Sequence, residues 1–251
     1  MDGQLAAWQT QTLRLTAFPS PSAHIIQPTW WHDLRGEEPE SRISQPRKGG
    51  LRDEGPFADG YLILGVEPAR IDWRYTSIVD EKQKSEVFPT IGPLQDAIRV
   101  FAPLMNRWFE LETCPTVQRL AFGAVMFQPV QNLQTGYQRI MQYLPSVQID
   151  IENSSDFSYQ INRKRYSRIV QGLIINRLSR WSVMGLQDIS MQITPARAQG
   201  SLGPIYHACR LELDINTVPE FQGEFRRDQL SSLFQELIDL AVEIANHGDI
   251  P

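Results

Sequence analysis

Residues 157–187 read FSYQINRKRYSRIVQGLIINRLSRWSVMGLQ. This stretch contains the strand pattern on which the fold assignment depends, and its charge pattern suggests a binding site. Near its start, Phe157, Tyr159 and Ile161 alternate with polar residues, and a second strand-like segment, LIINRL, follows over residues 173–178. Alternation of apolar and polar residues is typical of a half-buried strand, because successive side chains point to opposite faces. We therefore expect an antiparallel hairpin that pairs residues 157–164 with residues 172–179.

The same stretch is strongly basic. It contains six cations and no Asp or Glu, whereas the rest of the chain holds 18 basic residues against 29 acidic ones. Arginines beside aromatic rings suit an anionic ligand, because guanidinium groups bind phosphate bidentately and rings stack on bases. The candidate anion or nucleic-acid site, here called the basic segment, comprises Arg163, Lys164, Arg165, Tyr166, Arg168, Arg177, Arg180 and Trp181. The competing interpretation is that these cations pair with carboxylates of the same chain or of a second subunit.

Period-two patterns continue on both sides of the basic segment. The clearest lies at residues 207–215, where apolar residues share one face and Arg210, Glu212 and Asp214 share the other. Residues 120–127 are apolar on both faces, which is typical of a strand in the middle of a sheet. Further strands are expected over residues 13–19, 61–66, 71–78 and 181–193, with the second and third of these forming a hairpin.

Three segments have the spacing of amphipathic helices. Leu94, Ile98, Phe101, Met105 and Trp108 recur every three or four residues and form one apolar stripe, although Pro103 predicts a kink or break within this helix. Residues 133–144 and 230–245 follow the same spacing, and a glycine at position 248 is a plausible stop for the last helix.

Strands grouped with strands, together with these helices, predict an α+β protein with antiparallel sheets in which each half is covered by a long amphipathic helix. The polar stretch 148–156 divides the chain into an N-terminal half, residues 1–147, and a strand-rich C-terminal half, residues 148–251, unless the two form one continuous domain. Residues 19–60 are expected to be a long loop, because prolines, glycines and charges of both signs interrupt the periodicity there. Trp30 and Trp31 are expected to dock this loop onto the body.

Composition and motifs narrow the function classes. The chain has 251 residues, 41% hydrophobic and 21% charged, and a net charge of −5, so it has an ordinary globular composition without a general attraction to nucleic acid. Neither a signal peptide nor an apolar run long enough for a membrane helix is recognised, so we expect a cytoplasmic protein that does not enter the membrane. The sequence lacks GxSxG, P-loop, GxGxxG, HExxH and CxxC motifs, so no catalytic residue, metal or cofactor is assigned.

Two histidines offer weaker enzymatic alternatives. His32 stands beside Asp33, and His207 shares a strand face with Cys209. Either pair could support acid–base or nucleophilic chemistry if a substrate site lay beside it. The simpler interpretations are a loop anchor for His32 and core packing for His207.

Two longer runs carry a family resemblance. Residues 88–130 read FPTIGPLQDAIRVFAPLMNRWFELETCPTVQRLAFGAVMFQPV, while LELDINTVPEF at 211–221 and LSSLFQELIDLAVEIANH at 230–247 supply a strand and a closing helix. From Tyr61 to the C-terminus the chain resembles a sporadically distributed bacterial family of uncharacterised α+β proteins of about this length. The resemblance implies a cytoplasmic α+β protein from a mobile or accessory gene neighbourhood, including defence-type systems. It implies no activity and no site.

The preferred hypothesis from the sequence is a non-enzymatic binding or adaptor protein that recognises a partner protein, or a further copy of itself, through its sheet and long loop. The alternative is a nucleic-acid or nucleotide-binding protein that uses the basic segment. An enzyme centred on His207 or His32 is the third hypothesis.

Overall fold

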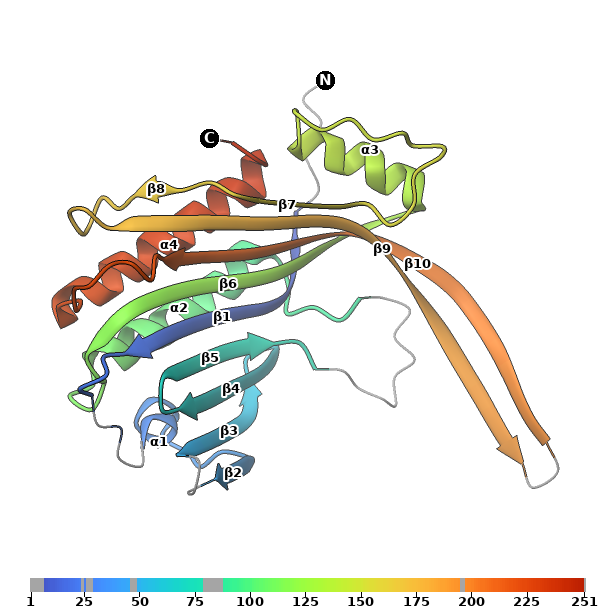
Figure 1. The fold of residues 1–251 in the computed structure, drawn as a ribbon. Coiled ribbons are helices and arrows are strands. Elements are labelled where there is room, and N and C mark those ends of the chain that lie inside the picture. Colours follow the sequence, from blue (N-terminus) through green and yellow to red (C-terminus); the bar gives the residue numbers. More distant parts are fainter. Residues whose placement is uncertain are drawn as a thin grey trace.

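The computed structural model describes residues 7–23, 25, 29–45, 49–78, 88–194 and 197–250, with the backbone alone described over 188–194 and 197–201. These residues form one ten-stranded sheet in which every neighbouring pair of strands is antiparallel (Figure 1). The strands are β1 (Gln9–Pro19), β2 (Ser41–Gln45), β3 (Gly50–Phe57), β4 (Gly60–Glu67), β5 (Arg70–Thr76), β6 (Val117–Val130), β7 (Ser158–Asn162), β8 (Arg165–Tyr166), β9 (Ile174–Thr194) and β10 (Arg197–Thr217). The helices are α1 (Trp30–Arg35), α2 (Leu94–Glu110), α3 (Leu133–Tyr143) and α4 (Arg227–His247).

The strand order is β2-β3-β4-β5-β1-β6-β10-β9-β7, with β8 also paired to β9. The predicted α+β class is therefore confirmed, but the strands belong to one sheet rather than to several. β6 lies at its centre, as its two apolar faces predicted, and pairs with β1 on one side and β10 on the other. Because β10 comes from the expected C-terminal half, residues on both sides of position 148 share one continuous sheet.

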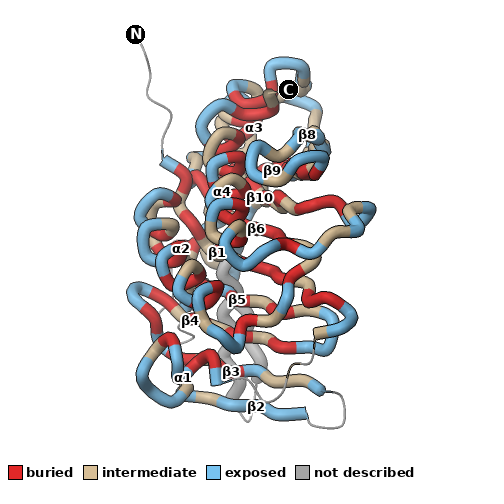
Figure 2. Tube along the Cα trace, turned by 90° about the vertical axis from the view of Figure 1, so that its left-hand side faces the viewer, coloured by how far each residue is buried: buried red, intermediate tan, exposed pale blue. Residues whose placement is uncertain are grey.

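The helices gather on one side of the sheet (Figures 1 and 2). α2 and α4 contact each other; α2 lies against β1, and α4 lies against β6, β9 and β10. α1 contacts α2, while α3 lies over β9 and β10. Alternate residues of the strands meet these helices in one hydrophobic core that includes all six tryptophans. Within the described residues no helix covers the opposite side of the sheet, which we call the open face.

The segment 19–60, expected to be a loop, instead contains α1, β2 and β3, so that expectation was wrong. Alternation along β3 is hard to recognise because two of the positions that face the core carry Asp53 and Gly55. Asp53 is fully buried and accepts hydrogen bonds from Nε and Nη2 of Arg42 at 2.7 and 2.9 Å. Gly55 lies against Trp31, where a Cβ would come within 3.2 Å of the indole ring. A charge and a glycine therefore occupy places where a strand usually shows apolar side chains.

The two longest strands also differ from their predicted bounds. β9 is continuous where two strands were expected. Two prolines and two glycines predict a loop over residues 195–204, but β10 begins at Arg197, inside it. Positions 195 and 196 of that expected loop lie outside the described residues. β9 and β10 consequently form a hairpin that projects from the body (Figure 1). Near Pro103 the sequence predicted a kink or break, and α2 runs as one helix through this residue.

Candidate functional site

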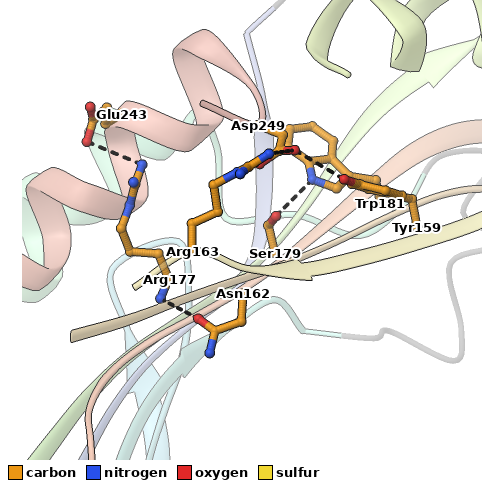
Figure 3. Close-up of polar contacts among 8 residues, drawn as sticks. All are labelled: Tyr159, Asn162, Arg163, Arg177, Ser179, Trp181, Glu243 and Asp249. Carbon is orange, nitrogen blue, oxygen red and sulfur yellow. Dashed lines mark hydrogen bonds and ion pairs between the residues drawn. The ribbon is translucent and has the colours of Figure 1, made fainter. Parts of the chain in front are cut away.

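The basic segment is divided between the two faces of the sheet, because its residues alternate along β8, the residues that flank β8, and β9. Arg163 and Arg177 lie on the covered face and point toward α4 and the residues that follow it (Figure 3). Arg165 lies on the same face and donates to Glu243 of α4. Lys164, Tyr166 and Arg168 are exposed. The structure therefore does not bring the eight residues to one surface.

Arg163 holds the residues that follow α4. Its Nε and Nη2 donate to the two carboxylate oxygens of Asp249 at 2.6 and 2.9 Å (Figure 3). The hydroxyl of Tyr159 donates to the same carboxylate at 3.2 Å. These hydrogen bonds, that from Arg163 above all, lower the pKa of Asp249 below its usual range. The backbone contributes as well, since the N–H of Asp249 donates to the carbonyl of Tyr143 at 2.9 Å.

Arg177 is the most unusual member of the set, because it is a cation with only 1% of its surface exposed. Its Nη2 lies 3.5 Å from Oε2 of Glu243, an oxygen that also accepts from Nη1 of Arg165 at 2.7 Å. Within the described part of the chain, Nε and Nη1 of Arg177 have no hydrogen-bond partner. Burial lowers the pKa of Arg177, and the neighbouring Arg165 lowers it further. Desolvation of this cation is thus incompletely compensated.

Together these side chains form a cluster of three guanidinium groups and two carboxylates between the sheet and the C-terminal helix. We call it the arginine cluster, and its members are Arg163, Arg165, Arg177, Glu243 and Asp249. The interpretation that the basic residues pair with carboxylates of the same chain therefore describes Arg163 and Arg165 well. Their carboxylate partners, Asp249 and Glu243, lie 86 and 78 positions further along the chain.

The other two candidates at the end of the segment are also engaged within the chain. Arg180 donates from Nε and Nη2 to Oε1 of Gln160, and its Nη1 lies 3.7 Å from Glu212. Trp181 is fully buried and stacks on Tyr143 with ring centroids 5.4 Å apart. Its indole N–H donates to the hydroxyl of Ser179 (Figure 3). Trp181 is accordingly a core residue, with its ring turned away from the solvent.

The open face has a shallow hollow of about 500 Å³ that crosses strands β5, β1, β6, β10, β9 and β7. Arg14, Arg74, Arg180, Glu212 and Asp214 line it together with small and polar residues. The side chain of Arg14 lies over Gly123, where a Cβ would come within 3.2 Å of its guanidinium group, and is 3.9 Å from Asp214. Glycine at this position therefore lets Arg14 lie flat on the sheet.

Arg74 differs from the other cations of the hollow. It is exposed and makes no ion pair with any residue that the structure describes. The alternation of residues in the sequence places Arg74 on one polar strand face and Glu212 and Asp214 on another, and it predicts cross-strand ion pairs for such faces. It did not show that six strands bring them into one hollow.

The two histidine alternatives have different surroundings. Burial raises the pKa of the Cys209 thiol to about 12, and this thiol lies 3.4 Å from the carbonyl of Gly136, so it is poorly suited to act as a nucleophile beside His207. Nδ1 of His32 lies 3.6 Å from Glu38, at the edge of a second hollow between α1, β2 and β3. Asp33 accepts from the hydroxyl of Thr29 at 2.8 Å. Among the described residues, no group of three or more His, Cys, Asp and Glu side chains is arranged to hold a metal ion.

The fold and its surfaces thus define an α+β protein with a single antiparallel sheet covered on one side. No protein-family model matches the chain, and neither the curated proteins nor the solved structures contain a match to it. No helix in the described part of the chain is long and apolar enough to cross a membrane.

Proposed function

We propose that the chain is a non-enzymatic binding protein that holds a partner protein against the open face of its sheet. The observation that carries the proposal is the placement of the four helices of the described residues on one side of the sheet (Figure 2). The other side is left with a polar hollow. Antiparallel sheets commonly have one solvated face, so exposure alone is not sufficient. The composition of this face adds the more specific support.

An apolar patch adjoins the hollow on the open face. Phe88 packs on Phe127 with ring centroids 5.0 Å apart, and Ala208 is buried beside them. Val125 belongs both to this patch and to the lining of the hollow. Protein interfaces combine aromatic residues and arginines at their centre with a polar rim. Phe88, Phe127 and Ala208 are themselves buried, and Val125 at their edge is partly exposed. A protein surface that presents carboxylates to Arg74 and an aliphatic side chain to Val125 would match this arrangement.

The experiment is an affinity measurement with a partner identified by co-purification from the source cells. Arg74→Glu reverses an exposed charge that has no partner in the described chain, so we expect stability to change little and affinity for the partner to fall at least tenfold, or about 1.4 kcal/mol. Arg107→Glu is the matched control, because Arg107 is exposed on α2, on the opposite side of the sheet. Equal affinities of the two variants would exclude the open face as the docking surface.

A second candidate function rests on the exposed part of the basic segment. Lys164, Tyr166 and Arg168 follow one another at alternate positions, Tyr166 is 71% exposed, and the two cations have no side-chain ion pair among the described residues. Two cations around an exposed ring could bind a single nucleic-acid strand through phosphate contacts and base stacking.

The second candidate is tested by fluorescence anisotropy with a labelled single-stranded oligonucleotide. Binding should weaken steeply with salt and should be lost when Lys164 and Arg168 are changed to Glu. Reversal of Arg99 and Arg107 on α2 gives a control with the same net charge. If the two double variants bind equally, the exposed part of the basic segment is not the binding site.

A further inference from the structure

The hairpin formed by β9 and β10 extends well beyond the strands that flank it. β7 pairs with β9 only as far as Ser182, and β6 pairs with β10 only as far as His207. Beyond these points, at residues 185–194 and 197–205, the two strands pair with each other alone among the described residues. We call this two-stranded ribbon the arm. Both of its outer edges present backbone N–H and C=O groups without a strand partner.

One face of the arm continues the face of the sheet that helices cover in the body of the protein. Ile205 pairs with Gln187, and Leu202 pairs with position 189, two residues further along β9. Ile205 and Leu202 therefore lie on the same face of the sheet as the core residue Cys209. α3 covers this face only as far as Val183, against which Gly136 packs. Leu202 and Ile205 are therefore 71% and 52% exposed. A two-stranded ribbon with exposed aliphatic side chains is marginally stable alone in water.

The sequence of the arm indicates which edge is available. Natural edge strands are commonly protected by lysine, proline or inward-pointing charges, which prevent pairing with another chain. The β9 portion of the arm reads GLQDISMQIT and carries Asp188 as its one charge, without Lys, Arg or Pro, whereas the β10 portion contains both Arg197 and Pro204. The less protected edge is therefore that of β9.

We propose that the β9 edge of the arm pairs with the same edge of a second copy of this chain, which gives a four-stranded sheet in the order β10-β9-β9-β10. An antiparallel edge is complementary to itself about a two-fold axis, and two-fold dimers are the commonest homo-oligomers. The arm contains one Asp and one Arg, so two arms do not repel each other although the whole chain carries a net charge of −5. Pairing over ten residues would supply about ten backbone hydrogen bonds. This inference is independent of the partner proposed for the open face.

The first test is the molar mass of the full chain by light scattering over a dilution series. We expect a species of twice 28.7 kDa that dissociates on dilution. Replacement of residues 188–204 by Asn-Gly, which joins the paired residues Gln187 and Ile205 through a tight turn, should give a monomer whose tryptophan fluorescence is unchanged. A monomer at every concentration of the natural chain would overturn the proposal, as would a dimer that survives shortening of the arm.

The second test leaves the length of the arm unchanged. Ser190→Lys with Gln192→Lys places charges on the β9 edge of both copies, and we expect the dimer dissociation constant to rise at least tenfold. Arg74→Glu is the control and should leave the dimer intact. Single cysteines introduced in turn at positions 186–194 should form an intermolecular disulfide most readily near the two-fold axis. Cross-linking that is equal at all positions, or absent at all of them, would contradict pairing through this edge.

Discussion

Replacement of Arg177 by Met is expected to stabilise the protein, although the side chain is almost completely buried. Arg177 has one long ion pair, 3.5 Å from Glu243, and two nitrogens without partners in the described chain. A buried donor that lacks a partner costs about 1–3 kcal/mol. Methionine keeps the unbranched stem and adapts to irregular spaces. Because Glu243 retains Arg165 at 2.7 Å, we expect the free energy of unfolding to rise by about 1–3 kcal/mol.

Replacement of Glu243, the carboxylate of this ion pair, should instead lower the free energy of unfolding. Glu243→Gln leaves Arg177 buried beside Arg165 without the shared carboxylate, and removal of one partner of a buried pair typically costs about 3–5 kcal/mol. Since Glu243 is partly exposed, the lower end of this range is expected. In a chain that already carries Arg177→Met, the same change should cost about 1 kcal/mol or less.

Denaturant unfolding followed by tryptophan fluorescence measures all four members of this cycle, since the six tryptophans of the chain are buried. The slope against denaturant should be the same for each variant, which shows that only stability has changed. A loss of more than about 1 kcal/mol in Arg177→Met would refute the reasoning. It would mean that the two unpartnered nitrogens bind a water molecule or an anion that stabilises the fold.

Three further outcomes test the C-terminal packing and the core. Gly248→Ala should lower the free energy of unfolding by about 2 kcal/mol or more, because φ is 78° and a Cβ would lie 2.0 Å from the carbonyl of Tyr143; Gly172→Ala, with a similar φ and open space around it, should cost less in the same assay. The pKa of Asp249 is lowered by Arg163, so this carboxylate contributes its full stability above the unfolded pKa of about 3.9 and loses it as the pH falls through the lower folded value. Asp249→Asn should therefore be less stable at pH 7 and lose less on acidification, and a parallel pH dependence of both proteins would contradict this. Both cysteine thiols have pKa values raised by burial to about 12, so iodoacetamide at pH 8 should modify them only after denaturation, as judged by mass spectrometry.

The sequence predicted most of the strands and helices in which apolar residues recur with the period typical of that element. β10 and α4 were recognised because their apolar residues follow periods of two and of three to four, and Gly248 is the cap of α4 as expected. β3 was missed because Asp53 and Gly55 occupy positions that face the core. Asp53 can be buried because Arg42 on the neighbouring strand β2 pairs with it, and Gly55 faces the core because Trp31 lies against it. The local sequence pattern reveals neither neighbour.

The candidate site was harder to predict than the fold. The basic segment was visible as composition, but the division of its residues between two faces depends on where the sheet and α4 lie. Arg163 and Arg165 are paired with carboxylates 86 and 78 positions further along the chain. Only the tertiary structure brings those groups together, and it also assembles the hollow around Arg74 from six strands.

The central position of β6 determines the order in which the chain can fold. β6 pairs with β1, about a hundred residues before it, and with β10, about ninety residues after it, while α4 covers the joint between β6 and β10. The indole N–H of Trp8 donates to the carbonyl of Ala245, which links positions 237 residues apart. During synthesis, β6 therefore has one unpaired edge and an uncovered apolar face until β10 and α4 have left the ribosome. Folding dominated by such distant contacts is slow, and the nascent chain is open to aggregation or chaperone binding during this interval.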